Sequence, residues 1–524
     1  MPGVTSYTLR TGSPARTRSD AVVAGVVWTP QGPRLGEAAA EVGEAYGRKL
    51  RPLLASMGVT GKAGEAVTLP TNGVVKAPLL VLVGLGPDET DHVAVRRAAG
   101  VAARSVPNAA SVALALPAGT PELVAAVTEG HLLGGYTFTR YKSAKPSKGA
   151  RSSGKDAPLD TEPTTKDAVD AVVLSPVARR ADAVAAFEAA QVVARAVLQC
   201  RDWVNTPPGD LTPPLFADAV SSAHAELTKG RGAPKVGIEV LDEDQLAEMG
   251  CGGILSVGSS SVAPPRLVRL TWEPPAAVAH LALVGKGVTF DSGGLTIKPS
   301  SSMLHMKGDM AGAAAAVAAT FAIARLGLPL RVTTYAPMAE NMVSGTSSRP
   351  GDVVTMRGGT TVELANLDAE GRMLLGDALA LAVEQRPDLV VDIATLTGHM
   401  QVALGDKVAA VMGSDDAQRS LVLDASAAAG EPHWPMPIPE EMTERVTSSK
   451  VADLLQHDWV RWGGGLYAAA FLREFTAGLP WAHLDIAGNE MNTGGPYGHV
   501  PAGATGFGVA TLVQLARDLV ALRS

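Results

Sequence analysis

The sequence predicts two α/β domains, a smaller N-terminal one and a larger C-terminal one whose mixed, mostly parallel sheet is flanked by helices. Short apolar runs alternate with helix-like stretches along the chain, an order typical of α/β domains. In the N-terminal part, residues 78–86 (PLLVLVGLG) and 110–117 (ASVALALP) have the composition of buried strands, and residues 34–58 have a helical pattern. We therefore expect a sheet with helices packed against it.

A polar segment separates the two domains. Residues 143–167 are rich in Ser, Pro, Lys and Gly and offer almost no side chains to bury, which predicts an exposed loop at the end of an N-terminal domain spanning residues 1–176. A long helical pattern follows and ends before the paired prolines of NTPPGDLTPP. We predict that residues 177–204 form a linking helix and that residues 205–524 form the second domain.

The second domain contains six strand candidates. Helix-like segments separate most of them, which predicts a second α/β sheet. In such sheets ligands bind at the carboxyl ends of the strands, so functional residues are expected in the loops that follow them. The candidates are residues 235–242, 266–273, 280–287, 331–337, 388–398 and 481–488.

The composition excludes several classes of protein. The 524 residues are 46% hydrophobic and 19% charged, and the formal net charge of -7 argues against binding to nucleic acid or anionic lipid. Because Cys200 and Cys251 are the only cysteines, we expect neither a disulfide framework nor a cysteine zinc site. The N-terminus lacks the apolar core of a signal peptide, and the longest apolar run, residues 311–324, is too short to span a bilayer. A cytoplasmic protein without a membrane partner is expected.

Two loops concentrate charged residues. The first, residues 284–317, follows a strand candidate and contains several glycines together with Lys286, Asp291, Lys298, Lys307 and Asp309. Glycines let the backbone pass close to a ligand, and the apolar neighbours of these charges indicate burial. The second loop, residues 366–373 (NLDAEGRM), lies where a helical pattern begins and contains Asp368, Glu370 and Arg372.

Several interpretations of these charges compete. Asp368 and Glu370 can simply stabilise the start of a helix, whose positive end favours carboxylates. The segment VGKGV lacks the spacing of a Walker A phosphate loop, and no His-Glu-x-x-His zinc motif occurs. Four carboxylates buried together would repel one another unless cations neutralised them, so two divalent metal ions are the alternative to helix capping. The four are Asp291, Asp309, Asp368 and Glu370.

The two loops resemble those of the leucyl aminopeptidase (cytosol aminopeptidase) family, which are hexameric two-metal exopeptidases. The fragments RDWVNTPPGDLTP, DIATLTG, VADL, WAHLDIAG and GATGFGV match as well, in family order, so the resemblance covers about residues 200–520, with a fainter match at LLGGYTFTRYK. The resemblance implies a metal-dependent aminopeptidase that releases N-terminal amino acids from peptides by attack of a metal-activated water. It also implies a preference for Leu or other apolar residues, and a homohexamer.

The resemblance implies a set of metal ligands. One ion is expected to bind Lys286, Asp291, Asp309 and Glu370, and the other to bind Asp291, Asp368 and Glu370. The ions are expected to be Mn or Zn. Only a neutral amine has a lone pair, so the metal must displace the proton of Lys286. An ordinary ion pair between Lys286 and Asp291 is the alternative.

The resemblance implies two catalytic residues. Lys298 is expected to stay cationic and to hydrogen-bond the oxyanion that develops on the substrate. Arg372 is expected to hold bicarbonate, which accepts a proton from the attacking water. A salt bridge on the helix surface is the alternative for Arg372. Lys307 has no family role, and we assign it a structural one.

The resemblance also implies a pocket for the first side chain of the substrate, in which Leu396 contributes a backbone oxygen. Each pocket residue could instead belong to the core. The expected residues are Met306, Thr395, Leu396, Gly398 and Ala487.

The chain departs from the family pattern near this pocket. Leu367 replaces a usual Thr, Met373 a usual Leu and His399 a usual Ala, and GNEMNTGG replaces a typical Thr-Ala-aromatic stretch. Because His399 and residues 489–491 adjoin the expected pocket, the substrate preference stays open. His399 could add a titrating group there or simply pack.

Two other functions are possible for such a chain. Some relatives act as DNA-binding accessory proteins, but the intact ligand set and the acidic charge balance give that function no support. Another dimetal amide or ester hydrolase would use the same chemistry. A phosphate-ester hydrolase of this kind would turn over phosphate esters and not leucine amides.

Overall fold

The chain forms two compact units. The computed structural model describes residues 6–143 and 169–523, so the loop predicted at 143–167 lies almost entirely outside the described residues. The first unit comprises residues 1–194 with 495–501, and the second comprises the rest. In the sequence, the boundary at residue 194 falls inside helix α5 (Ala181–Asn205), which the sequence predicts as the linking helix. The predicted domain limits stay predictions.

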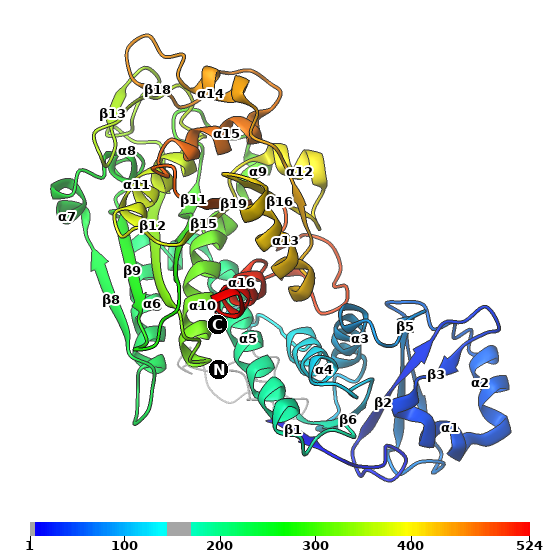
Figure 1. The fold of residues 1–524 in the computed structure, drawn as a ribbon. Helices are drawn as coiled ribbons and strands as arrows, with labels where there is room; N and C mark the ends of the chain where they lie inside the picture. The colour runs from blue at the N-terminus through cyan, green and yellow to red at the C-terminus, as the bar shows by residue number, and fades with distance from the viewer. Residues whose placement is uncertain (1–5, 144–168, 524) are drawn as a thin grey trace, which may run out of the picture. The chain divides into compact units, whose positions relative to one another are not determined.

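A seven-stranded sheet forms the centre of the first unit (Figure 1). Its order is β1-β7-β6-β2-β5-β4, with β3 paired to β2, and all pairs are parallel except those of β3 and β4. The strands are β1 (Ser6–Arg10), β2 (Ala21–Val27), β3 (Arg34–Leu35), β4 (Ala66–Pro70), β5 (Leu79–Gly86), β6 (Ser111–Ala115) and β7 (Asp170–Leu174).

Helices cover both faces of this sheet because β2 is buried along its whole length and presents apolar side chains to each face. One apolar cluster joins the strands to α3 and α4, and a second joins them to α1 and α2. A side chain at Gly130 or Gly134 of α4 would collide with the backbone of α3, so these glycines permit close packing of the two helices. The helices are α1 (Ala40–Tyr46), α2 (Leu50–Ser56), α3 (His92–Ser105) and α4 (Pro121–Gly134).

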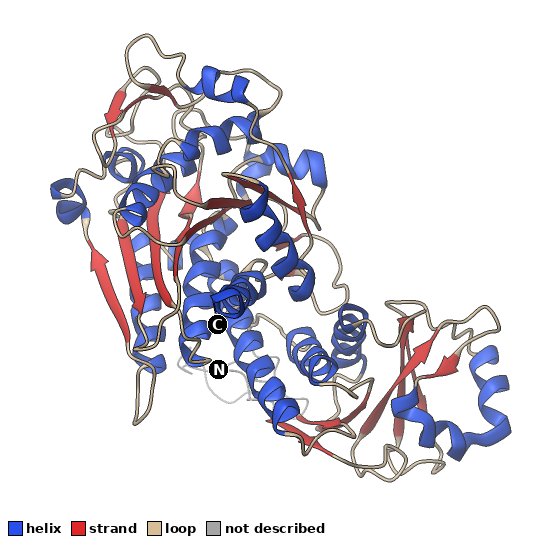
Figure 2. Cartoon of the chain, viewed as in Figure 1, coloured by secondary structure: helices blue, strands red, loops and turns tan. Residues whose placement is uncertain are grey.

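The second unit is built on a nine-stranded mixed sheet (Figure 2). Its order is β17-β16-β19-β15-β10-β12-β9-β8, with β11 paired to β12. The pairs of β10, β15, β19, β11 and β12 with one another are parallel, whereas β8, β9 and β16 add antiparallel pairs. The strands are β8 (Val236–Leu241), β9 (Arg266–Trp272), β10 (His280–Gly285), β11 (Gly287–Asp291), β12 (Arg331–Asn341), β15 (Leu389–Ala394), β16 (Ala409–Gly413), β17 (His433–Pro435) and β19 (Trp481–Asp485).

This sheet confirms the predicted fold class and corrects one detail. All six strand candidates of the second domain form strands, but residues 287–291, which we assigned to a loop, form β11. Its pairing to β12 carries a register shift between Val288 and Phe290. This short, irregular strand is hard to predict, because it lies between glycines and its residues show no regular alternation of apolar and polar side chains.

Helices flank both faces of the nine-stranded sheet. On one face α8, α11 and α15 share a large apolar cluster with the strands. Helix α10 packs against β10, β12 and β15, and α16 packs against α10 and α13. A side chain at Gly312 of α10 would collide with the carbonyl of Ile393, so the alanine-rich helix lies directly on the strands. The helices are α6 (Pro213–Leu227), α7 (Glu243–Glu248), α8 (Gly252–Gly258), α9 (Ser300–Met303), α10 (Ala311–Arg325), α11 (Gly371–Val383), α12 (Gly398–Leu404), α13 (Asp416–Ala429), α14 (Glu440–Val446), α15 (Gly464–Arg473) and α16 (Val509–Arg523).

Two small sheets complete the second unit. One has the order β13-β14-β18, with β13 (Val353–Thr355), β14 (Thr361–Glu363) and β18 (Leu454–Leu455). The other pairs β20 (Met491–Asn492) with β21 (Gly503–Ala504). Both hold loops that lead to the site described below.

Helix α5 is long and apolar enough to cross a membrane by length and composition alone. Charged residues interrupt this helix, so its sequence contains no long uninterrupted apolar run. One of them, Arg201, has 1% of its surface exposed and donates a hydrogen bond from Nε to the carbonyl of Thr505 at 2.8 Å. A buried, hydrogen-bonded arginine is typical of a core helix.

Candidate active site and metal centre

The charged residues of the two loops come together at the carboxyl ends of the central strands. Lys286 lies between β10 and β11, and Asp291 is the last residue of β11. Asp309 directly follows the short 3₁₀ helix Met306–Gly308, and Glu370 directly precedes α11. Parallel strands end at the same edge of a sheet, which is why two loops far apart in the sequence meet here.

Lys286 is buried between two carboxylates and a backbone carbonyl. Its Nζ lies 2.8 Å from Asp309 Oδ1 and 2.9 Å from Glu370 Oε1, and it donates to the carbonyl of Thr395 at 2.9 Å. Burial lowers the pKa of Lys286, but Asp309, Glu370 and Asp291 together outweigh burial and hold the pKa above its ordinary value. Without a metal ion, this lysine is therefore the cation that neutralises the cluster.

Lys298 neutralises the other side of the cluster. Its Nζ lies 2.7 Å from Asp291 Oδ2 and forms a second ion pair with Asp368 Oδ1. Burial and the charge of Glu370 raise the pKa of Asp291 well above its usual range, in that order of size. For Glu370, Lys286 and Lys298 outweigh burial, so its pKa lies below the ordinary value.

The carboxylates fit a metal centre. One oxygen from each of Asp291, Asp309 and Glu370 lies within 4.8 Å of the others, and all three side chains are buried. Among the residues that the structure describes, Asp309 Oδ2 and Glu370 Oε2 are buried without a hydrogen-bond partner. Buried carboxylate oxygens without a donor are costly, and a divalent cation would satisfy them. Asp368 is linked to these three carboxylates by Lys298, which forms ion pairs with both Asp368 and Asp291.

Three residues outside the predicted set of site residues hold the site in place. Asn341 Nδ2 donates to Asp291 Oδ1 at 2.8 Å and to the carbonyl of Leu367 at 3.0 Å, so it ties the two loops together. Gln456 accepts from the backbone of residues 365 and 366 and donates to the carbonyl of Ala369. The third, Asp485, orients the pocket loops. The only signals for Gln456 and Asp485 in the sequence are two fragments that match the family. VADL lies just before Gln456, and WAHLDIAG contains Asp485.

Arg372 lies in the first turn of α11 and is buried. Its Nη1 donates to the carbonyl of Gln456 at 2.7 Å, and its guanidinium lies 5.6 Å from the ring centre of Tyr467. Burial lowers the pKa of Arg372. Its Nε has no hydrogen-bond partner among the described residues, so a donor remains for an anion. A salt bridge on the helix surface, the alternative interpretation, is ruled out by this burial.

The expected pocket residues lie on loops beside the carboxylates. Thr395 donates from Oγ1 to Asp309 Oδ1 at 2.7 Å. Asp485 Oδ1 accepts from the backbone N–H of Leu396 at 3.1 Å and of Ala487 at 3.2 Å, which joins the loops after β15 and β19. A side chain at Gly398 would meet nothing within 4 Å, so space is open there.

The remaining residues of the prediction have simpler surroundings. Met306 is half-buried at the start of the 3₁₀ helix. Lys307 donates to the carbonyl of Asn205 at 2.9 Å, in line with its structural assignment. Leu367 and Met373 belong to the apolar core. His399 is exposed and packs against Gly464, with Nε2 at 3.2 Å from the carbonyl of Arg461.

The buried carboxylates and lysines at the carboxyl edge of this α/β sheet fit the centre of a metal-dependent hydrolase. The sequence profile of the cytosol aminopeptidase family, catalytic domain, matches residues 198–513, and that of its N-terminal domain matches residues 23–145. The chain therefore belongs to the cytosol aminopeptidase family, as the resemblance predicted, and is a metal-dependent aminopeptidase.

Similar proteins cover nearly the whole chain. It is 45% identical to a probable cytosol aminopeptidase of Streptomyces coelicolor, with 98% of each chain covered, and 46% identical to one of Micrococcus luteus, with 95% of each covered. A tomato leucine aminopeptidase variant has a TM-score of 0.82 and 28% identity, covering 98% of this chain and 97% of its own. The bottromycin maturation enzyme BotP in complex with Mn has a TM-score of 0.81 and 37% identity, covering 96% and 99%.

Proposed function

We propose that this aminopeptidase removes apolar residues such as Leu or Met from the N-termini of peptides, with two divalent ions in each chain. The observation that carries the proposal is the buried cluster in which Lys286 and Lys298 bracket the carboxylates. Lys286, Asp291, Asp309 and Glu370 would hold one ion; Asp291, Asp368 and Glu370 would hold the other.

Such ions, when bound, polarise the scissile carbonyl and lower the pKa of a water molecule to near neutral. The residues of the chain supply the rest. Lys286 must give up its proton to become a ligand, whereas Lys298 keeps its charge and donates a hydrogen bond to the oxygen of the substrate carbonyl as negative charge develops. The partial exposure of Lys298, 15% against 3% for Lys286, supports this division, because only Lys298 has a side that a substrate can reach.

Arg372 would hold a small anion, bicarbonate, which accepts the proton of the attacking water. Two observations among the described residues support an anion here: the Nε of Arg372 has no hydrogen-bond partner, and no side chain caps the start of α11. The pocket walls would be the apolar or small residues Met306, Thr395, Gly398 and Ala487, with the carbonyl of Leu396 accepting a hydrogen bond from the substrate.

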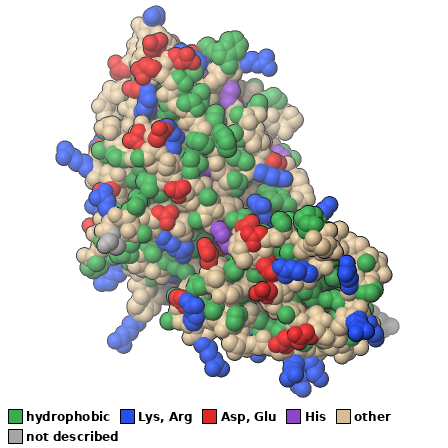
Figure 3. Space-filling model, turned by 45° about the vertical axis from the view of Figure 1, so that its right-hand side comes forward, with side chains coloured by type: hydrophobic (Ala, Val, Ile, Leu, Met, Phe, Trp, Pro, Cys, Tyr) green, Lys and Arg blue, Asp and Glu red, His purple; other side chains and the backbone are tan. Residues whose placement is uncertain are grey.

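We further propose that Mn or Zn is the native metal and that the protein works in the cytoplasm as a homohexamer on peptides. The Mn in the BotP structure and the names of the relatives support the first two. We propose no nucleic-acid partner and no membrane partner. On the face drawn in Figure 3, the Lys and Arg side chains of the described residues are interspersed with Asp and Glu, and the net charge is -7.

The test combines metal analysis with an assay on a panel of amino-acid amides. We expect two ions per chain and hydrolysis of the Leu and Met amides. Turnover of phosphate esters without amide hydrolysis would contradict the proposal.

Two further measurements test the proposed partners. Light scattering should give six times the mass of one chain. DNA retardation that weakens steeply with salt would show a nucleic-acid partner after all.

A further inference from the structure

A carboxylate lies next to the expected substrate pocket and has no role in the metal centre. Glu490 follows the turn that contains Ala487, and its Oε2 accepts from the backbone N–H of Gly488 at 2.7 Å. A Cβ at Gly308 would lie 3.4 Å from Cγ of Glu490. The side chain therefore lies between the 3₁₀ helix that begins at Met306 and the turn that contains Ala487, and both of these residues are expected to line the pocket.

This position is fixed by the fold around it. The carbonyl of Glu490 accepts from the backbone N–H of Thr505 at 3.0 Å, and Met491, the next residue, begins β20. Gly488 has a φ of +91°, and a Cβ there would lie 2.7 Å from Cγ of Gln401, so this turn accepts only glycine comfortably. The backbone thus holds the carboxylate at one place beside the pocket.

Glu490 lacks a cation. No Lys, Arg or His of the described part of the chain forms an ion pair with it. Its side chain is only partly accessible to solvent. Burial is the main cause that raises its pKa to about 7; the charges of Asp309 and Asp485 act in the same direction, and hydrogen bonds from the backbone oppose them. A partly buried carboxylate without a counter-ion costs free energy, which a bound cation would offset.

The chemistry of the pocket indicates which cation fits. Lys and Arg have long aliphatic stems that can pack against apolar walls such as Met306 while the charged end reaches further. The α-amine of the substrate would lie at the metal centre and not at Glu490, so the cation must belong to the side chain. A guanidinium or ammonium would form a charge-assisted hydrogen bond with the carboxylate.

We propose that Glu490 makes this aminopeptidase accept peptides with N-terminal Lys or Arg, by pairing with the cationic end of that side chain. The inference rests on the proposed function, because it assumes that Met306 and Ala487 line the pocket for the first residue. It extends the substrate class from apolar residues to long basic ones.

The test compares kcat/KM for anilides of Leu, Met, Lys and Arg, using the full-length, Mn-loaded protein and its Glu490→Gln variant. The glutamine keeps the size of the side chain and removes its charge. We expect the Lys/Leu and Arg/Leu ratios of kcat/KM to fall by about 10- to 100-fold, the usual worth of a hydrogen bond to a charged group. Glu490→Lys should lower both ratios further and raise hydrolysis of the Glu anilide relative to Leu.

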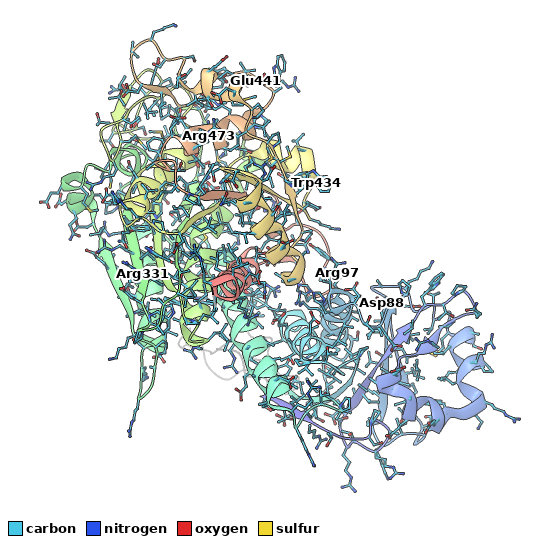
Figure 4. All side chains as sticks on the ribbon, viewed as in Figure 1. Asp88, Arg97, Arg331, Trp434, Glu441 and Arg473 are labelled. Carbon is cyan, nitrogen blue, oxygen red and sulfur yellow. The ribbon has the colours of Figure 1, made fainter. Side chains whose placement is uncertain are left out.

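The matched control is Glu441→Gln, an exposed charge removal on α14, labelled in Figure 4. Both ratios should keep their wild-type values in this variant.

An equal loss for all four substrates in Glu490→Gln would overturn the inference, because it would show that Glu490 only supports the turn. If the wild-type protein hydrolyses the Leu and Met anilides but not the Lys or Arg anilides, the inference is also overturned, and the proposed function stays intact. No hydrolysis of any anilide by the metal-loaded wild type would instead defeat the proposed function.

Discussion

At the scale of single residues, the carboxylates of the site need a cation on each side. Lys286 and Lys298 supply it, and every side chain in their ion pairs is less than a third exposed. Removal of one partner from such a network leaves the others buried and unpaired, which is costly. Glu370 is the partner of Lys286 and a proposed bridge between the two ions, so its loss should have the largest effect.

Glu370→Ala should abolish hydrolysis of Leu anilide and lower the metal content of the purified protein. Even residues that only orient metal ligands change metal affinity by about 10- to 100-fold, so loss of a bridging ligand should exceed that range. Metal analysis of the dialysed variant and a kcat measurement check both effects. Near wild-type activity in this variant would contradict the ligand assignment.

Arg372→Ala should slow turnover and leave both ions bound. The side chain does not contact the carboxylates but binds the carbonyl of Gln456 and packs on Tyr467. We expect kcat to fall by about 10²- to 10⁴-fold, the range for loss of general acid or base catalysis, with partial recovery when bicarbonate is added. Arg372→Lys is the control for charge. If the metal is lost from the alanine variant, the proposed role is wrong.

At the scale of elements, the start of α11 positions the second loop against the first. Gly371 opens the helix, and a Cβ there would lie 2.6 Å from Cε and 2.8 Å from Nζ of Lys286. A glycine in a helix normally costs about 1 kcal/mol relative to alanine. Here the glycine lets Lys286 reach Glu370.

Gly371→Ala should therefore lower activity and metal affinity, although helix propensity favours alanine. Gly43→Ala in α1 is the matched control, because a Cβ there meets only ordinary contacts at 3.6 Å and 3.7 Å. We expect the control to keep its activity and to gain up to about 1 kcal/mol in stability. Activity assays and urea unfolding of both variants make the comparison. Equal behaviour of the two variants would contradict the role of Gly371.

A buried carboxyl group in α11 should make stability depend on pH. Asp377 accepts from the backbone N–H of Ile254 and of Arg357, both at 2.8 Å, so it joins α11 to α8 and to the turn after β13. Burial raises the pKa of Asp377 to about 7, although these hydrogen bonds oppose it.

Because the folded state holds this proton up to about pH 7 and the unfolded state releases it near pH 4, the free energy of unfolding from this group falls as pH rises between those values. The loss is on the order of 4 kcal/mol. Asp377→Asn cannot ionise, so its stability relative to wild type should rise from pH 5 to pH 8. Urea unfolding at both pH values measures this difference. Parallel pH profiles for the two proteins would refute it.

At the scale of the whole molecule, metal binding should stabilise the second unit. The unpartnered oxygens of Asp309 and Glu370 belong to the folded site and not to the unfolded chain, so ions bind the folded state preferentially. Chelator should abolish peptidase activity and lower the Tm, and added Mn or Zn should restore both. A hundredfold excess of metal over its Kd corresponds to about 2.7 kcal/mol. An unchanged Tm with chelator would mean that the ions do not bind this cluster.

The sequence alone determined the chemistry of this protein and its fold class. Apolar runs of the buried-strand type predicted the central strands, since burial on both faces leaves a continuous apolar signal. The charges of the two loops were visible because glycines and a helix start surround them. The resemblance of ordered fragments then indicated the family and a set of ligands, which the structure brings to one edge of the sheet.

Only the tertiary structure decided which groups hold those charges in position. Asn341, Gln456 and Asp485 are polar residues in strands or loops, without a spacing that marks them, and each binds backbone or side chains from another part of the chain. Glu490 likewise has no signal of its own in the sequence beyond a departure from the family pattern. Hydrogen-bond partners across long separations depend on how strands are ordered in the sheet, and local residue patterns do not encode that order.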